Sequence, residues 1–225
     1  MRGPSYFEQF SVVWLFGLTN SAIMMLLVLF VVLLALKGMD LIPKRWQVFF
    51  ELVYFHFYCV AKDNLGVEGL RLFPFILSLF FYLVFLNIFG LCPYVFTPTT
   101  HIIVTLGFSF SIIIGVTLSG LWRFKKDFFS ILMPSGAPLV LAPLLVLIET
   151  ASYISRAISL GVRLAANLSA GHLLFAILAG FGMIFKSAIL IMVFIILLEM
   201  AVAIIQAYVF CLLTAIYLAD TLDLH

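Results

Sequence analysis

The chain has 225 residues, of which 65% are hydrophobic and only 10% are charged, and its formal net charge is +2. So few polar residues cannot cover the surface of a soluble globule of this length, and the expected class is a multi-span helical membrane protein. The basic residues are not clustered, so no nucleic-acid partner is expected. A single membrane domain over 1–225 fits the length.

The first half of the chain contains three predicted spans and one helix of a different kind. An apolar run over 11–36 predicts the first span, and two more are predicted over 72–92 and 101–121. The segment 41–63 carries a polar stripe at helical spacing with aromatic residues elsewhere on the wheel. This pattern predicts an amphipathic helix in the membrane interface, and a slightly polar extra span is the alternative.

The second half is dominated by two helical segments that are too long for upright spans. Residues 138–179 would form a helix of ~63 Å at ~1.5 Å per residue, whereas the hydrocarbon core is only ~30 Å thick. This segment must either break or lie steeply tilted. Gly180 and Gly182 are expected to turn the chain into the last segment, 183–219. The prediction is an all-α membrane protein with about five transmembrane helices and one interfacial helix, the last two helices forming a long tilted hairpin over 138–219.

The distribution of basic residues predicts the orientation. The region 37–71 and the loop 122–127 hold most of the lysines and arginines, and the loop 93–100 holds none. Because basic loops stay on the cytoplasmic or matrix side, 37–71 and 122–127 are expected on the inner side of the membrane and the N-terminus on the outer side.

Arg163 is the residue that points most directly to function. It lies inside an apolar stretch, where a permanent cation costs roughly 3 kcal/mol on insertion scales. Arginine cannot lose its proton to avoid this cost. An ion or proton path is therefore the first function to consider.

The other polar residues of the hairpin follow helical spacing. Glu149, Arg156 and Arg163 are seven residues apart and share a face, which Asn167 continues. On the last helix, Glu199 and Gln206 are also seven apart. If the two helices are antiparallel, Arg163 can lie near Gln206, and His172 near Glu199. A purely structural pairing of these groups is the alternative. Arg156 could also extend its guanidinium to the interface.

Other classes of site are not indicated. The chain has no glycine-rich phosphate loop, and its histidines are scattered one per segment, so neither a metal site nor a cofactor is expected. A stand-alone ion or solute transporter that uses the arginine as an anion site is the alternative function. Transporters of this kind usually contain repeated halves, and this sequence shows no internal repeat.

The block Ser159 to Leu164, followed by Asn167 and by Ala170-Gly171-His172, resembles the signature of the subunit a family of the F-type ATP synthase. The resemblance covers about 140–220, including Glu199 and Gln206, and the earlier spans resemble the family only in topology. The order of the acidic residue and the histidine resembles the mitochondrial members. Ala165-Ala166 and Arg156 depart from the expected pattern.

The resemblance implies a non-catalytic stator subunit that carries protons past the rotating c-ring. It implies that Arg163 is the essential cation facing a carboxylate of the ring. The implied proton path comprises Glu149 towards the inner side, Asn167 and Gln206 beside the arginine, and His172 with Glu199 towards the outer side. It also implies the c-ring, the peripheral stalk and other Fo subunits as partners in a lipid bilayer. The implied location is the mitochondrial inner membrane, with the bacterial plasma membrane as the alternative.

Overall fold

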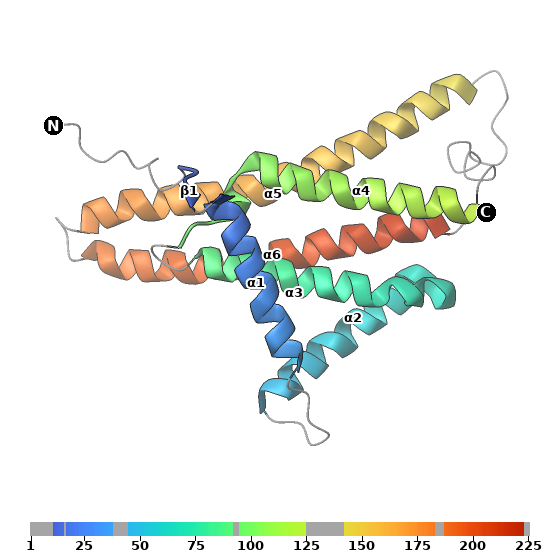
Figure 1. Ribbon diagram of the computed structural model, residues 1–225. Coiled ribbons are helices and arrows are strands. Elements are labelled where there is room, and N and C mark those ends of the chain that lie inside the picture. The colour runs from blue at the N-terminus through green and yellow to red at the C-terminus, as the bar shows by residue number, and fades with distance from the viewer. Residues whose placement is uncertain are drawn as a thin grey trace. The chain divides into compact units, whose positions relative to one another are not determined.

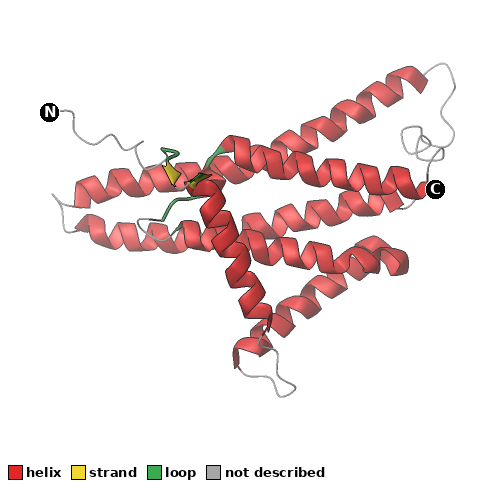
Figure 2. Ribbon diagram, in the orientation of Figure 1, coloured by secondary structure: helices red, strands yellow, loops and turns green. Residues whose placement is uncertain are grey.

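The computed structural model is almost entirely helical (Figure 2). It describes residues 11–15, 17–37, 45–91, 95–124, 142–182 and 187–222. Within these ranges, four helices are long and apolar enough to cross a membrane, and Asn20–Leu34 forms a shorter apolar helix. The predicted class, an all-α membrane protein, is confirmed.

The first helix begins later than the apolar run predicts. Helix α1 covers Asn20–Lys37, and before it a small antiparallel hairpin pairs β1 (Trp14–Leu15) with β2 (Leu18–Thr19). Gly17 in the turn has φ 84°, a conformation that glycine adopts at little cost. The hydroxyl of Thr19 then accepts a hydrogen bond from the amide of Ala22 at 3.3 Å, which caps the helix. The predicted start at residue 11 is therefore wrong.

The predicted interfacial helix is present as α2, Arg45–Gly69, and residues 41–44 lie outside the described ranges. Its polar stripe is joined by a hydrogen bond of 3.2 Å from Gln47 to Glu51. Gly66 interrupts the helix with φ 63°. The helix is not among the four candidate spans. Its position in the interface stays a prediction.

The middle spans agree with their predicted ranges. A short turn, η2 (Leu70–Leu72), leads into α3, Phe73–Gly90. The chain returns through the short 3-10 helix η3, Pro98–Thr100, to α4, Ile102–Phe124. The residues of η3 are buried, and α1 packs on them. Residues 98–100 are therefore part of the packed protein.

The two long helices are α5, Ala142–Gly182, and α6, Ser187–Leu222. Helix α5 is continuous, so the alternative of a break is not what the structure shows. Gly180 and Gly182 belong to its last turn, which corrects the prediction that they end the helix; the connection at 183–186 lies outside the described ranges. With 41 residues, α5 exceeds what an upright span needs. The steep tilt stays a prediction, as does the single-domain organisation.

The chain forms two compact units. The first contains Met1–Ile42, Leu79–Thr105 and Val162–Val209, and it holds the C-terminal part of α5 beside the N-terminal part of α6 (Figure 1). The second contains Pro43–Ser78, Leu106–Gly161 and Phe210–His225. Within the second unit, the backbone of Leu106 approaches Gly161 so closely that a Cβ there would lie 3.0 Å from Leu106 Cα. Glycine is therefore what allows α4 and α5 to meet at this point.

Candidate functional site

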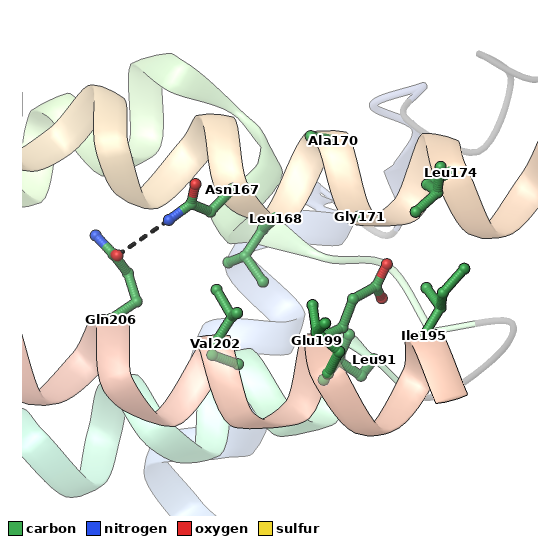
Figure 3. Close-up of a pocket in the computed structure, with 12 residues that line it drawn as sticks. Leu91, Asn167, Leu168, Ala170, Gly171, Leu174, Ile195, Glu199, Val202 and Gln206 are labelled. Carbon is green, nitrogen blue, oxygen red and sulfur yellow. Dashed lines mark hydrogen bonds between the residues drawn. The ribbon is translucent and has the colours of Figure 1, made fainter. Parts of the chain in front are cut away.

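The site lies in the first unit, where α5 and α6 pack antiparallel. The side-chain amide of Asn167 donates a hydrogen bond to Gln206 Oε1 at 3.1 Å (Figure 3). Further along, Gly171 of α5 lies against Glu199 of α6. The later residue of α5 therefore meets the earlier residue of α6, as in an antiparallel pair of helices. This is the hairpin that the sequence predicts.

A cavity of about 370 Å³ lies between these two helix segments, and Leu91, just after α3, also lines it. Its walls are mainly apolar, and its polar side chains are Asn167, Glu199 and Gln206. Glu199 Oε1 and Gln206 Nε2 are buried atoms without a hydrogen-bond partner in the described part of the chain. Buried polar atoms are normally satisfied by protein or water, and the volume is ample for several water molecules. The cavity therefore suits a hydrated path through an otherwise apolar region.

Glu199 reaches the cavity because α5 has no side chain where the two helices meet. A Cβ placed on Gly171 would lie 2.6 Å from Glu199 Oε1 and 2.8 Å from its carboxyl carbon. Figure 3 shows the carboxylate directed at the α5 ribbon beside Gly171. The absence of a side chain at Gly171 therefore leaves space for the Glu199 carboxylate.

His172, the next residue of α5, interacts with the loop that precedes α4. Its Nε2 lies 3.2 Å from Thr97 Oγ1, which also donates a hydrogen bond to the carbonyl of Gly90 at 3.3 Å. One turn earlier, Ser169 donates to the carbonyl of Thr100 at 3.0 Å. The histidine is therefore held in place by a docked loop.

Arg163 is exposed, one helical turn before Asn167 on the same face of α5. A cation in an apolar helix is costly unless it faces protein or water.

The two remaining charged residues of α5 lie in the second unit. The guanidinium carbon of Arg156 is 5.5 Å from the ring centroid of Tyr217 and 6.0 Å from that of Tyr153, in cation–π geometry. Arg156 is therefore placed against aromatic rings. Glu149 belongs to α5, but its side chain lies outside what the structure describes.

The pairs joined by the structure differ slightly from those suggested by the spacing. Gln206 is hydrogen-bonded to Asn167, which lies four residues beyond Arg163, the neighbour predicted from the spacing. Glu199 lies against Gly171, one residue before His172. Helical periodicity gives the face of a helix but not the register against its neighbour, and this accounts for offsets of one turn or less.

Two polar residues of the site were not predicted from the sequence. Thr97 contacts His172, and Asn87 donates to the carbonyl of Ala203 at 3.3 Å from inside α3. Asn87 could have been found, because an amide in an otherwise apolar span usually makes an interhelical hydrogen bond. Thr97 gives no comparable signal, since threonines in a loop are unremarkable.

Comparison with known proteins decides the family. The family model described as "ATP synthase A chain" matches residues 18–219. ATP synthase subunit a of Metridium senile is 65% identical over 231 residues, which cover 99% of this chain and 100% of the relative. The subunits of Marchantia polymorpha (44% identical, 97% of this chain and 98% of the relative) and Mycosarcoma maydis (45% identical, 93% and 88%) are also similar. The chain belongs to the ATP synthase A chain family.

The family match extends well beyond the motif from which the resemblance was drawn. It includes α1 through α4 as well as the two long helices. The predicted resemblance to the subunit a family is confirmed. The roles of individual residues rest on the geometry above and are taken up as proposals below.

The contact between Gly171 and Glu199 yields a prediction for this member of the family. Gly171→Ala places a methyl group where the carboxylate lies, and because a carboxylate at the end of a flexible side chain can move, we expect the protein to fold. Overpacking of this kind costs roughly 1–3 kcal/mol of stability, and proton-driven ATP synthesis should fall because the carboxylate of Glu199 is displaced. Gly107→Ala is the matched control, because a Cβ there meets nothing within 4 Å. Equal rates in the two variants would contradict the role of Gly171.

Proposed function

We propose that this chain is the non-catalytic, proton-translocating stator subunit of the ATP synthase Fo sector. The observation that carries the proposal is the arrangement on one hairpin of an exposed cation, Arg163, and a cavity that contains Glu199. Family membership supports the same role and counts against a stand-alone transporter. ATP chemistry belongs to other subunits in this proposal.

The physical reason for two offset half-channels is that protons cannot cross the hydrocarbon core unaided. A carboxylate of the c-ring takes a proton from one half-channel, travels through lipid in its neutral form, and releases the proton into the other. We assign Glu199 to the outer half-channel because it lines the cavity, and His172 with it because it directly follows Gly171, the residue against which Glu199 lies. Glu149 is assigned to the inner half-channel on sequence grounds. Each proton that crosses 100 mV yields ~2.3 kcal/mol for rotation.

Arg163 controls the step between the half-channels in this proposal. A fixed positive charge beside the ring carboxylate lowers the pKa of that carboxylate and favours loss of its proton. The same charge repels protons and prevents a direct leak from one half-channel to the other. Asn167 and Gln206, joined to each other, flank the passage next to the arginine.

The proposed partners are the c-ring, the peripheral stalk, the other Fo subunits and the lipid bilayer. The proposed location is the mitochondrial inner membrane, with several spans. The three relatives named above come from eukaryotes and match nearly the whole chain, which favours this location over a bacterial plasma membrane.

Labelling of single cysteines tests both the path and the orientation. In the assembled enzyme with its native cysteines replaced, Val202→Cys places a thiol on the cavity wall, and Lys125→Cys places one in the basic loop. A charged thiol reagent that cannot cross membranes should modify the first only from the outer side and the second only from the inner side. Leu164→Cys is the control that should stay unmodified, because Leu164 is fully buried and does not line the cavity. Modification of Lys125→Cys from the outer side would overturn the orientation.

A further inference from the structure

We propose that the N-terminal hairpin is a membrane-surface anchor, with Trp14 in the lipid head-group layer at the N-terminal end of α1. The hairpin pairs β1 with β2, and the amide of Asn20, the first residue of α1, donates to the carbonyl of Val13 at 3.2 Å. The hairpin is therefore joined directly to the helix. The partner in this proposal is the head-group region of a phospholipid bilayer, and the proposal does not depend on the proton path.

The hairpin exposes large apolar side chains on both of its faces. Trp14 is 75% exposed, and Val12, Val13 and Leu18 are each nearly half exposed. Trp14 and Val13 follow one another along an extended chain, so they point to opposite faces. A single two-stranded hairpin is at best marginally stable in water. A position in bulk water would leave this apolar surface uncovered as well.

The backbone of the hairpin excludes the opposite extreme, the hydrocarbon core. Each strand has two residues and is paired on one side, so in the described part of the chain its other edge has no strand partner. Lipid chains cannot satisfy the amide and carbonyl groups of such an edge. The membrane interface meets both requirements, because water and head groups reach the backbone while the apolar side chains enter the lipid. Tryptophan is enriched at this level because its ring is apolar and its indole N–H can donate.

The sequence around the hairpin agrees with a position at the membrane boundary. No charged residue occurs from Ser11 to Leu36, whereas Glu8 lies just before this run. A charged side chain is costly in hydrocarbon. Helix α1 has 18 residues, so at ~1.5 Å per residue it is about 27 Å long, close to the ~30 Å of the hydrocarbon core. If α1 crosses the membrane as predicted, the hairpin at its N-terminal end falls at the boundary.

Helix α1 also presents an apolar side that is continuous with the hairpin. Val28 and Val32, one turn apart, are buried, and α1 packs on η3. Leu26, Phe30 and Leu33 are each more than half exposed. In a membrane protein, an exposed apolar side of this kind faces lipid. The hairpin therefore extends a surface that already meets the bilayer.

Depth measurements by electron paramagnetic resonance test the position of the hairpin. In the assembled complex with its native cysteines replaced, Val13→Cys and the control Phe30→Cys each receive a nitroxide label, and the complex is reconstituted into phosphatidylcholine liposomes. Oxygen collides mainly with labels in hydrocarbon, and a water-soluble nickel chelate collides mainly with labels in water. We expect the ratio of nickel to oxygen collisions at Val13 to be several-fold higher than at Phe30 and several-fold lower than for free label in buffer.

Three results of this measurement would overturn the proposal. A ratio at Val13 equal to that of the free label would place the hairpin in water. A ratio equal to that at Phe30 would place it in the hydrocarbon core. Low collision rates with both reagents would show that protein, either another subunit or another part of this chain, covers the hairpin.

Substitution of Trp14 tests whether this side chain holds the hairpin at the interface. With the label at Val13, Trp14→Phe keeps an apolar ring and should leave the collision ratio unchanged. Trp14→Glu should raise the ratio towards that of the free label, because a carboxylate is costly below the head groups. Trp14→Ser, which adds no charge, should raise it in the same direction and serves if Trp14→Glu does not assemble. An unchanged ratio in Trp14→Ser or Trp14→Glu would overturn the role of Trp14.

Discussion

Replacing Arg163 with alanine is expected to abolish proton-driven ATP synthesis while the complex still assembles. The side chain is exposed and contributes nothing to the buried core of the hairpin, so its removal should not disturb packing. Removal of a cation from an apolar environment relieves a cost of roughly 3 kcal/mol on insertion scales. The loss should therefore be one of function, because nothing then favours release of the proton from the ring carboxylate or blocks the leak between the half-channels.

Arg163→Lys is the sharper variant of this experiment. Lysine keeps a positive charge in water but can lose its proton in a low-dielectric site, and it lacks the planar fork that binds a carboxylate with two hydrogen bonds. We expect synthesis close to background in liposomes under an imposed gradient. ATP hydrolysis by the soluble sector should be unchanged. Near-native synthesis in the lysine variant would contradict the assigned role.

Arg156→Gln is the matched control, because it removes another cation of the same helix. The Arg156 guanidinium interacts with Tyr153 and Tyr217 in cation–π geometry. Such contacts contribute ~0.5–2 kcal/mol, so the control should lower stability slightly and leave most of the proton flux. A loss as complete as that of Arg163→Ala would show that any charge removed from α5 stops the enzyme.

Much of this architecture can be predicted from apolar runs alone, and the error at the N-terminus shows the limit. Hydropathy cannot separate a helix from a short hairpin when both are apolar. Here Gly17 makes a turn and Thr19 caps the helix, so the apolar run starts well before α1. The same limit applies at Gly180 and Gly182, which are compatible with a helix end but lie inside the last turn of α5.

The contacts of the candidate site can likewise be predicted from the sequence only where they depend on local spacing along a helix. Helical spacing and an antiparallel hairpin predict Gln206 near Arg163, and the structure joins Gln206 to Asn167, one turn further along the same face of α5. The partner of His172 does not follow, since Thr97 approaches from a loop far away in sequence. No pattern within one helix can indicate which loop docks against it.

The pair His172 and Glu199 gives the second prediction of large effect. His172→Leu or Glu199→Leu should each reduce proton-driven synthesis far more than assembly. Glu199 is the carboxylate on the wall of the cavity, and His172 follows the glycine that makes room for it. An apolar group in either place removes a proton-binding group and its hydration. Val202→Ala, which trims an apolar wall of the same cavity, is the control and should retain most activity.

The exchanged variant, His172→Glu with Glu199→His, separates a relay from a static pair. A buried ion pair is a weak source of stability, whereas an imidazole beside a carboxylate can pass protons near neutral pH. Because the exchange keeps one group of each kind at neighbouring positions of the helix pair, it should retain part of the proton flux that both single leucine variants lose. The exchanged ring can no longer rest on Thr97, so recovery should be incomplete. If His172→Leu leaves synthesis intact, the outer entry path must lie elsewhere in the complex.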